Sequence, residues 1–140
     1  MNIYIDGVFD LFHYGHLMAL KKAKNLYPNV YLIVGVLNDK VAEDYKRLPI
    51  INEKHRYEII ENIKIVDKII KDAPLEITKE FMDTNNIDLI VHGFSNINDA
   101  DNQDICFKYP KSINKFQEIK YTTEISTSDI IKKIKDENYL

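Results

Sequence analysis

The sequence predicts an α/β fold, a Rossmann-like, doubly wound parallel sheet of five strands in a single domain that covers residues 1–140. Short β-rich runs alternate with segments of helical periodicity, which is typical of parallel sheets with crossover helices. The run VYLIVGV is apolar throughout, as expected of a central strand covered on both faces. A chain of 140 residues with 45% apolar residues suffices for one such core.

Strands are expected where a short apolar run lies between polar or turn-forming residues. In chain order they are residues 2–5, 30–36, 66–70, 87–91 and 116–119. The first ends at an Asp6-Gly7 turn. The polar stretch at residues 92–104 is expected to be a loop, because it lacks a clear apolar period.

Helices are expected where apolar side chains recur at helical spacing or follow a capping residue. In order they are residues 15–26, 38–43, 52–63, 78–84 and 128–135. Pro28 ends the first. The later helices are expected to be capped by Asn38, Asn52, Thr78 and either Ser126 or Thr127, whose short polar side chains accept hydrogen bonds from free backbone N–H groups. A loop with Lys46, Arg47 and Pro49 separates the second and third helices.

Composition excludes several classes of protein. The formal net charge is −3, and only Arg47 and Arg56 among the 19 basic residues are arginine, which argues against a general nucleic-acid binder. No run of eighteen apolar residues exists to span a membrane, and the acidic Asp6 argues against a signal peptide. A single cysteine, Cys106, fits a reducing compartment. We therefore expect a cytoplasmic protein.

The segment YIDGVFDLFHYGH carries the clearest chemical signal. His13 and His16 are three residues apart where a helix begins, which places both imidazoles on one face. The same turn presents free backbone N–H groups and the positive end of the helix dipole. This pattern suits a phosphate that undergoes substitution. Two alternatives remain open from these residues alone: a metal site, for which HxxH supplies only two ligands, and a purely structural pair.

The segment DGVFDLFHYGH resembles the HxGH signature of the cytidylyltransferase group of nucleotidyltransferases. Other segments resemble further motifs of that family in the same order, so that the resemblance covers essentially the whole chain. They are YLIVGV with Asn38-Asp39, Tyr45-Lys46, NEKHRY at residues 52–57, VDKI at residues 66–69, and ISTSD at residues 125–129.

The resemblance implies a set of site residues. The residues expected to bind CTP are Val8, Phe9, Asp10, His13, Gly15, His16, Lys46, His92, Gly93, Ser126 and Thr127. His13, His16 and Lys46 are expected to be catalytic. Lys46 would bridge the phosphates of both substrates as a flexible point charge, and His92 with Gly93 would lie along the cytidine.

The family reaction joins CTP and a phospho-alcohol to give a CDP-alcohol and pyrophosphate, as in phospholipid synthesis. The resemblance implies direct in-line attack on the α-phosphorus, stabilised by positioning and charge. Mg²⁺ is expected to arrive with CTP, because no dedicated carboxylate cage is evident. Relatives of this type are homodimers, so a homodimer is expected.

Two departures from the family pattern bear on activity. Tyr121 stands where the family has an arginine that holds the triphosphate, and Glu124 stands where it has glycine. Both changes should weaken CTP binding. Arg47, which follows Lys46 where the family has glycine, is a candidate for the missing charge. The alternative to an enzyme is a catalytically weak or silent nucleotide-binding module.

Ethanolamine phosphate is the favoured substrate from sequence. Choline enzymes have a tryptophan where this chain has Leu75, whereas His92-Gly93 resembles the ethanolamine enzymes. Without tryptophan, a cation–π site for a trimethylammonium group is weaker. Choline phosphate is the alternative, glycerol 3-phosphate the third candidate, and an ATP-dependent adenylyltransferase with the same HxGH motif a further one.

Overall fold

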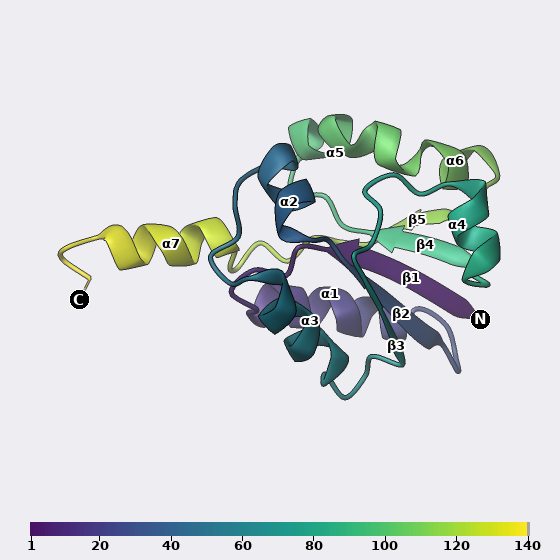
Figure 1. The fold of residues 1–140 in the computed structure, drawn as a ribbon, viewed down its shortest axis with the longest axis horizontal. Helices are drawn as coiled ribbons and strands as arrows, with labels where there is room; N and C mark the ends of the chain where they lie inside the picture. The colour runs from purple at the N-terminus through teal and green to yellow at the C-terminus, as the bar shows by residue number, and fades with distance from the viewer. Residues whose placement is uncertain (140) are drawn as a thin grey trace.

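A computed structural model describes residues 1–139 and confirms the predicted fold class (Figure 1). Five parallel strands form one sheet in the order β3-β2-β1-β4-β5. The strands are β1 (Asn2–Gly7), β2 (Tyr31–Val36), β3 (Lys68–Lys71), β4 (Leu89–His92) and β5 (Phe116–Glu118). Strand order reverses between β1 and β4, which are neighbours, so the crevice at their carboxyl ends is where such folds bind ligands.

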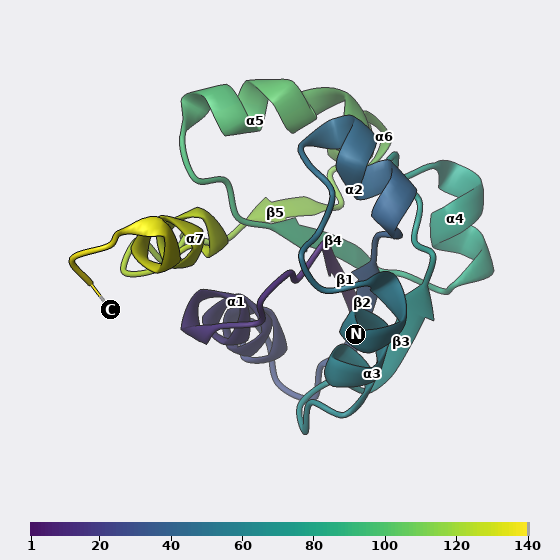
Figure 2. The same cartoon turned by 60° about the vertical axis from the view of Figure 1, so that its left-hand side comes forward.

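Helices cover both faces of the sheet. The helices of the chain are α1 (Tyr14–Lys24), α2 (Asp39–Tyr45), α3 (Glu53–Glu61), α4 (Lys79–Thr84), α5 (Ile97–Gln103), the 3₁₀ helix η1 (Asp104–Phe107), α6 (Lys108–Ser112) and α7 (Thr127–Lys135). Figures 1 and 2 show α1 and α3 on one side and α4, α5 and α6 on the other, while α7 extends away from the body. The ends of the shared predicted elements differ from these by at most two residues.

Strand alternation divides the core into two clusters. Ile3 and Ile5 of β1 face α1 and α3, whereas Tyr4 between them faces α4 and η1. Tyr4 is fully buried, and its hydroxyl lies over Gly35 of β2, where any Cβ would overlap the phenol. A glycine in a central strand is therefore needed to admit this ring.

The predicted capping residues begin their helices as expected. In each case the side-chain oxygen accepts a hydrogen bond from the backbone N–H three residues on. These residues are Asn38, Asn52, Thr78 and Ser126. Of the two candidates for α7, Ser126 is the cap and Thr127 is the first helical residue.

The prediction of a loop over residues 92–104 is wrong. Asn96 caps the short helix α5, which continues into η1 and α6. Sequence periodicity missed α5 because the helix is polar and only Gln103 in it is buried. The adjoining helix η1 anchors α5, since Cys106 and Phe107 pack into the second core cluster. Tertiary packing has here overridden weak local propensity.

No helix among residues 1–139 is long and apolar enough to cross a membrane.

Candidate active site

A cavity of about 270 Å³ opens at the carboxyl ends of β1 and β4, at the reversal of strand order. Every residue that the sequence predicted for the site lines it. These residues are Val8, Phe9, Asp10, His13, Gly15, His16, Lys46, His92, Gly93, Ser126 and Thr127. They come from separate segments of the chain, and the fold brings them together in one cavity.

The two histidines form the start of α1. His13 is the cap, and its Nδ1 accepts a hydrogen bond from Gly15 N at 3.0 Å. His16 Nδ1 in turn accepts from His13 N at 3.2 Å. The two rings are stacked with their centroids 3.9 Å apart. This is a capping box in which imidazoles replace the usual hydroxyl and carboxylate. The two histidines are only three residues apart in the chain, so the pair could be recognised from the sequence.

These hydrogen bonds fix the chemical state of both rings. Because each Nδ1 accepts a backbone N–H, the neutral ring carries its proton on Nε2. Burial lowers the pKa of His13, and burial followed by the neighbouring His13 lowers the pKa of His16 to about 3. Both imidazoles are therefore neutral donors near pH 7, suited to developing negative charge on a phosphate.

Close packing around the dyad requires Gly15. A Cβ at Gly15 would lie 2.8 Å from His13 Cε1 and 3.1 Å from the carbonyl oxygen of Ile125. The preceding loop is strained, because Phe9 and Leu11 have φ values of 56° and 49°, in a region that side chains disfavour. Surrounding contacts hold this loop, including the Phe9 ring against the ring of His16.

Thr127, the first residue of α7, ties that helix to the dyad. Its hydroxyl donates to the carbonyl oxygen of Asp10 at 3.0 Å and lies 3.3 Å from His13 Nε2. Since the hydroxyl proton is used on Asp10, its lone pairs are free to accept the Nε2–H of His13. The N-terminus of α7, capped by Ser126, thus stands directly beside the dyad.

Asp10 and Arg56 hold the loops of the site in place. The Asp10 carboxylate accepts hydrogen bonds from the backbone N–H groups of Ile50 and Ile51, at 2.8 and 2.9 Å. Asp10 was predicted to bind CTP, and it lines the cavity while these two bonds hold its carboxylate against the loop. Arg56 is fully buried and donates to carbonyl oxygens of Val8, Leu37 and Ile51 and to the Asp39 carboxylate. In the sequence, Arg56 was marked only by its place in the NEKHRY segment.

Two cationic side chains follow α2 at the rim of the cavity. Lys46 ends that helix and is exposed, so its ammonium can reach ligands in several positions. Arg47 lies deeper, with its side chain one-third exposed. Together with the two imidazoles and the start of α7, they make one side of the cavity suited to phosphate. We call this the phosphate side.

Another part of the cavity wall carries carboxylates and aromatic rings that were not among the predicted site residues. Asp6, at the end of β1, is buried, and its Oδ1 lies 3.3 Å from His92 Nδ1. Asp99 of α5 also lines the cavity, as do Tyr45 and Tyr121. We call this the head-group side.

The electrostatics of the head-group side follow from these carboxylates. Burial and the Asp99 carboxylate raise the pKa of Tyr45 to about 12, and burial followed by the carboxylates of Asp99 and Asp129 raises the pKa of Tyr121. Both phenols are therefore neutral near pH 7. Neutral aromatic rings beside two carboxylates suit a cation. Among residues 1–139, no three His, Cys, Asp or Glu side chains are arranged to hold a metal ion.

A parallel sheet whose crevice holds a histidine pair beside two helix N-termini is an arrangement by which α/β folds bind phosphate groups. The sequence profile described as Cytidylyltransferase-like matches residues 4–133, and the chain belongs to that family.

Two curated relatives and one solved structure illustrate the similarity. The chain is 43% identical to choline-phosphate cytidylyltransferase 2 of Arabidopsis thaliana, over 99% of this chain and 46% of that protein. It is 36% identical to ethanolamine-phosphate cytidylyltransferase of Dictyostelium discoideum, over 94% of this chain and 36% of that protein. The chain thus spans less than half the length of these relatives.

The solved structure is a lipopolysaccharide core biosynthesis protein from Thermoplasma volcanium. It superposes with a TM-score of 0.69 at 26% identity, covering 87% of this chain and 98% of that one.

Proposed function

We propose that this chain transfers CMP from CTP to a phosphorylated amino-alcohol, giving a CDP-alcohol and pyrophosphate. The observation that carries the proposal is a single cavity lined by cations and neutral N–H donors together with the buried Asp6 carboxylate, the half-buried Asp99 and aromatic rings. A zwitterion with a phosphate at one end and an ammonium at the other matches this polarity. Glycerol 3-phosphate has no cation for Asp6, and is therefore disfavoured.

The chemistry is an in-line displacement. An oxygen of the substrate phosphate forms a bond to the α-phosphorus of CTP while the bond from that phosphorus to the β-phosphate oxygen breaks, and the electron pair leaves with pyrophosphate. The Nε2–H groups of His13 and His16 donate to the oxygens on which charge grows, and the His13 Nε2–H leaves the Thr127 hydroxyl to do so. Lys46 draws the two anions together, which lowers the repulsion between them.

Mg²⁺ belongs to the nucleotide in this proposal. Residues 1–139 supply no cage of three acidic or imidazole ligands, so the ion would arrive bound to the triphosphate and keep mostly phosphate and water ligands. The chain's own contribution is to position both phosphates and to donate hydrogen bonds.

Choline phosphate and ethanolamine phosphate are the two candidates for the substrate. The absence of tryptophan favours ethanolamine phosphate, as the sequence predicted. Two observations favour choline phosphate. Three aromatic side chains, Tyr45, Phe107 and Tyr121, line the cavity. The Arabidopsis choline enzyme is more similar to this chain than the Dictyostelium ethanolamine enzyme, at 43% against 36% identity. We place choline phosphate first and keep ethanolamine phosphate as the second candidate.

We also propose a homodimer in the cytoplasm. Three exposed apolar side chains, Tyr14, Leu48 and Ile50, lie on the two segments that meet at Asp10, and pairing of two copies would bury them. The single cysteine, buried and unpaired, fits a reducing compartment. Light scattering at micromolar concentration tests the dimer, and a monomer would contradict it.

The activity is tested by release of pyrophosphate from CTP or ATP in the presence of Mg²⁺ and each of three acceptors: choline phosphate, ethanolamine phosphate and glycerol 3-phosphate. We expect release with CTP and an amino-alcohol phosphate, and at least tenfold less with ATP or glycerol 3-phosphate. Binding of CTP without turnover of any acceptor would support the silent module. Turnover with ATP alone would assign an adenylyltransferase.

A further inference from the structure

Arg47 has hydrogen-bonding capacity that the rest of the described chain leaves unused. Its side chain is two-thirds buried at the wall of the cavity, and its Nε is buried without a hydrogen-bond partner among residues 1–139. A guanidinium presents five N–H donors in a rigid fork, and an unpaired buried donor costs free energy. An anion in the cavity would remove that cost.

The nearest carboxylate does not fill this role. Arg47 Nη2 lies 3.9 Å from Asp10 Oδ2, which is beyond hydrogen-bond distance. Both Asp10 oxygens already accept backbone N–H groups of Ile50 and Ile51. Asp10 therefore attracts the guanidinium and keeps it near the cavity, yet leaves its donors free.

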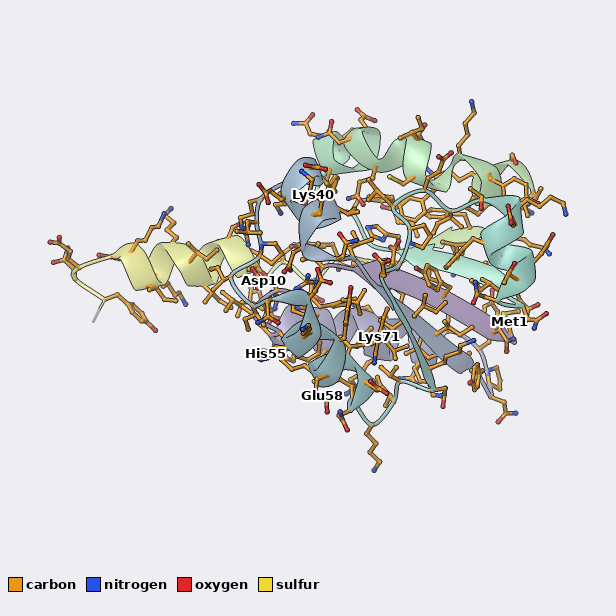
Figure 3. The ribbon with its side chains drawn as sticks, in the orientation of Figure 1. Met1, Asp10, Lys40, His55, Glu58 and Lys71 are labelled. Atoms are coloured by element: carbon orange, nitrogen blue, oxygen red, sulfur yellow. The ribbon has the colours of Figure 1, made fainter. Side chains whose placement is uncertain are left out.

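The position of Arg47 points to the phosphate side. Asp10 connects Arg47 to the dyad, because its carbonyl oxygen accepts the Thr127 hydroxyl, which lies 3.3 Å from His13 Nε2. Figure 3 shows Asp10 where α7 approaches the loops beside α1 and α3. Position 121, where the family has its arginine, holds a neutral phenol that also lines the cavity.

We infer that Arg47 binds the β- and γ-phosphates of CTP and supplies the charge that an arginine at position 121 would otherwise provide. The inference rests on the proposed function, since it names a residue that holds the same nucleotide. A planar fork can contact two phosphate oxygens at once, which suits a triphosphate. Lys46 then remains free to bridge the two substrates.

Calorimetric titration of CTP, pyrophosphate and CMP against the full chain tests the inference. In Arg47→Gln we expect the dissociation constants of CTP and pyrophosphate to rise on the order of tenfold to a hundredfold, the range for losing a charged hydrogen bond. The constant for CMP, which lacks β- and γ-phosphates, should change less than about twofold. Arg47→Lys should recover only part of the loss, because it keeps the charge without the fork.

A matched control is Lys40→Gln, which removes the same charge from the exposed face of α2 (Figure 3). Its affinity for CTP should equal that of the wild type. Adding Tyr121→Arg to Arg47→Gln should restore CTP affinity, because an arginine at position 121 would supply the charge lost at position 47. Circular dichroism would show whether each variant is folded. If Arg47→Gln is misfolded, the CTP affinity of Arg47→Lys tests the inference instead. An affinity of Arg47→Lys equal to that of the wild type would contradict a bidentate contact between the guanidinium and the phosphates.

Three outcomes separate the claims. Equal affinity of wild type and Arg47→Gln for CTP would overturn the inference and leave the proposed function intact. A rise confined to the KM of the amino-alcohol phosphate would also overturn it, because the guanidinium would then serve the second substrate. A wild-type chain that binds ATP but not CTP would overturn the proposed function, whereas the pyrophosphate titration would still report on Arg47.

Discussion

The two sides of the cavity are built in different ways. On the phosphate side, the hydrogen bonds that orient His13 and His16 join residues two and three positions apart in the chain. On the head-group side, Asp6, Tyr45, Asp99 and Tyr121 come from β1, α2, α5 and the segment after β5. The histidine dyad is therefore a product of local capping, whereas the rest of the phosphate side and all of the head-group side depend on how distant elements pack.

This difference predicts that the two sides have separate roles. Neutral N–H donors locked by their own helix can keep the same geometry whichever alcohol is bound. The head-group side can change through single substitutions on separate elements without disturbing the dyad. Turnover should therefore respond to changes on the phosphate side, and substrate preference to changes on the head-group side.

The largest effect is expected for His16→Ala. Loss of one donor to the developing charge should lower kcat by roughly a hundredfold or more. Steady-state kinetics with CTP and choline phosphate measure it, with Lys21→Ala as the control, since Lys21 is an exposed residue of the same helix. Unchanged turnover in His16→Ala would show that His16 takes no part in the reaction, and it would contradict the separate roles of the two sides.

Lys46→Ala tests the residue that serves both substrates. The loss of a charge shared by two phosphates should lower kcat and raise both KM values, each by about tenfold. Lys46→Arg should not restore either, because a planar fork does not replace a compact ammonium. Wild-type kinetics in either variant would make Lys46 an ordinary solvated lysine of the surface.

Asp6→Asn tests the head-group side alone. Replacing the buried carboxylate by a neutral amide of the same shape should raise the KM of the amino-alcohol phosphate by about tenfold. The KM of CTP should stay within about twofold. Asp83→Asn, an exposed position on α4, is the control. A rise in the KM of CTP instead would show that the two sides are not separate.

The smallest effect concerns stability against pH. Burial lowers the pKa of His16 from 6.5 to about 3, so the folded state keeps the ring neutral while the unfolded chain takes up a proton. This group's contribution to stability is therefore complete above pH 6.5 and is lost as the pH falls toward 3. The slope approaches about 1.4 kcal/mol per pH unit.

Urea unfolding between about pH 4.5 and about pH 7 measures that slope. His16→Asn, which cannot be protonated, should show a smaller dependence on pH, and His55→Asn, at an exposed position, should keep the wild-type dependence. Equal slopes for wild type and His16→Asn would mean that burial does not hold the imidazole neutral, which would contradict its role as a neutral hydrogen-bond donor.

Several features of the site depended only on nearby residues, and the sequence by itself determined them. The helix caps Asn38, Asn52, Thr78 and Ser126 were predicted correctly, because a cap is a hydrogen bond across three residues. The placement of both histidines on one turn followed from the same spacing. The class of sheet followed from an apolar run long enough to need cover on both faces.

Tertiary structure alone decided the remainder. The polar helix α5 has almost no apolar face, so its formation depends on the packing of Cys106 and Phe107 after it, which local periodicity does not encode. Packing likewise brought Asp99 of that helix into the wall of the same cavity as the dyad. Asp10 acquired its structural partners from a loop 40 residues away. Such contacts cross long stretches of chain, and their energies exist only once the elements are assembled.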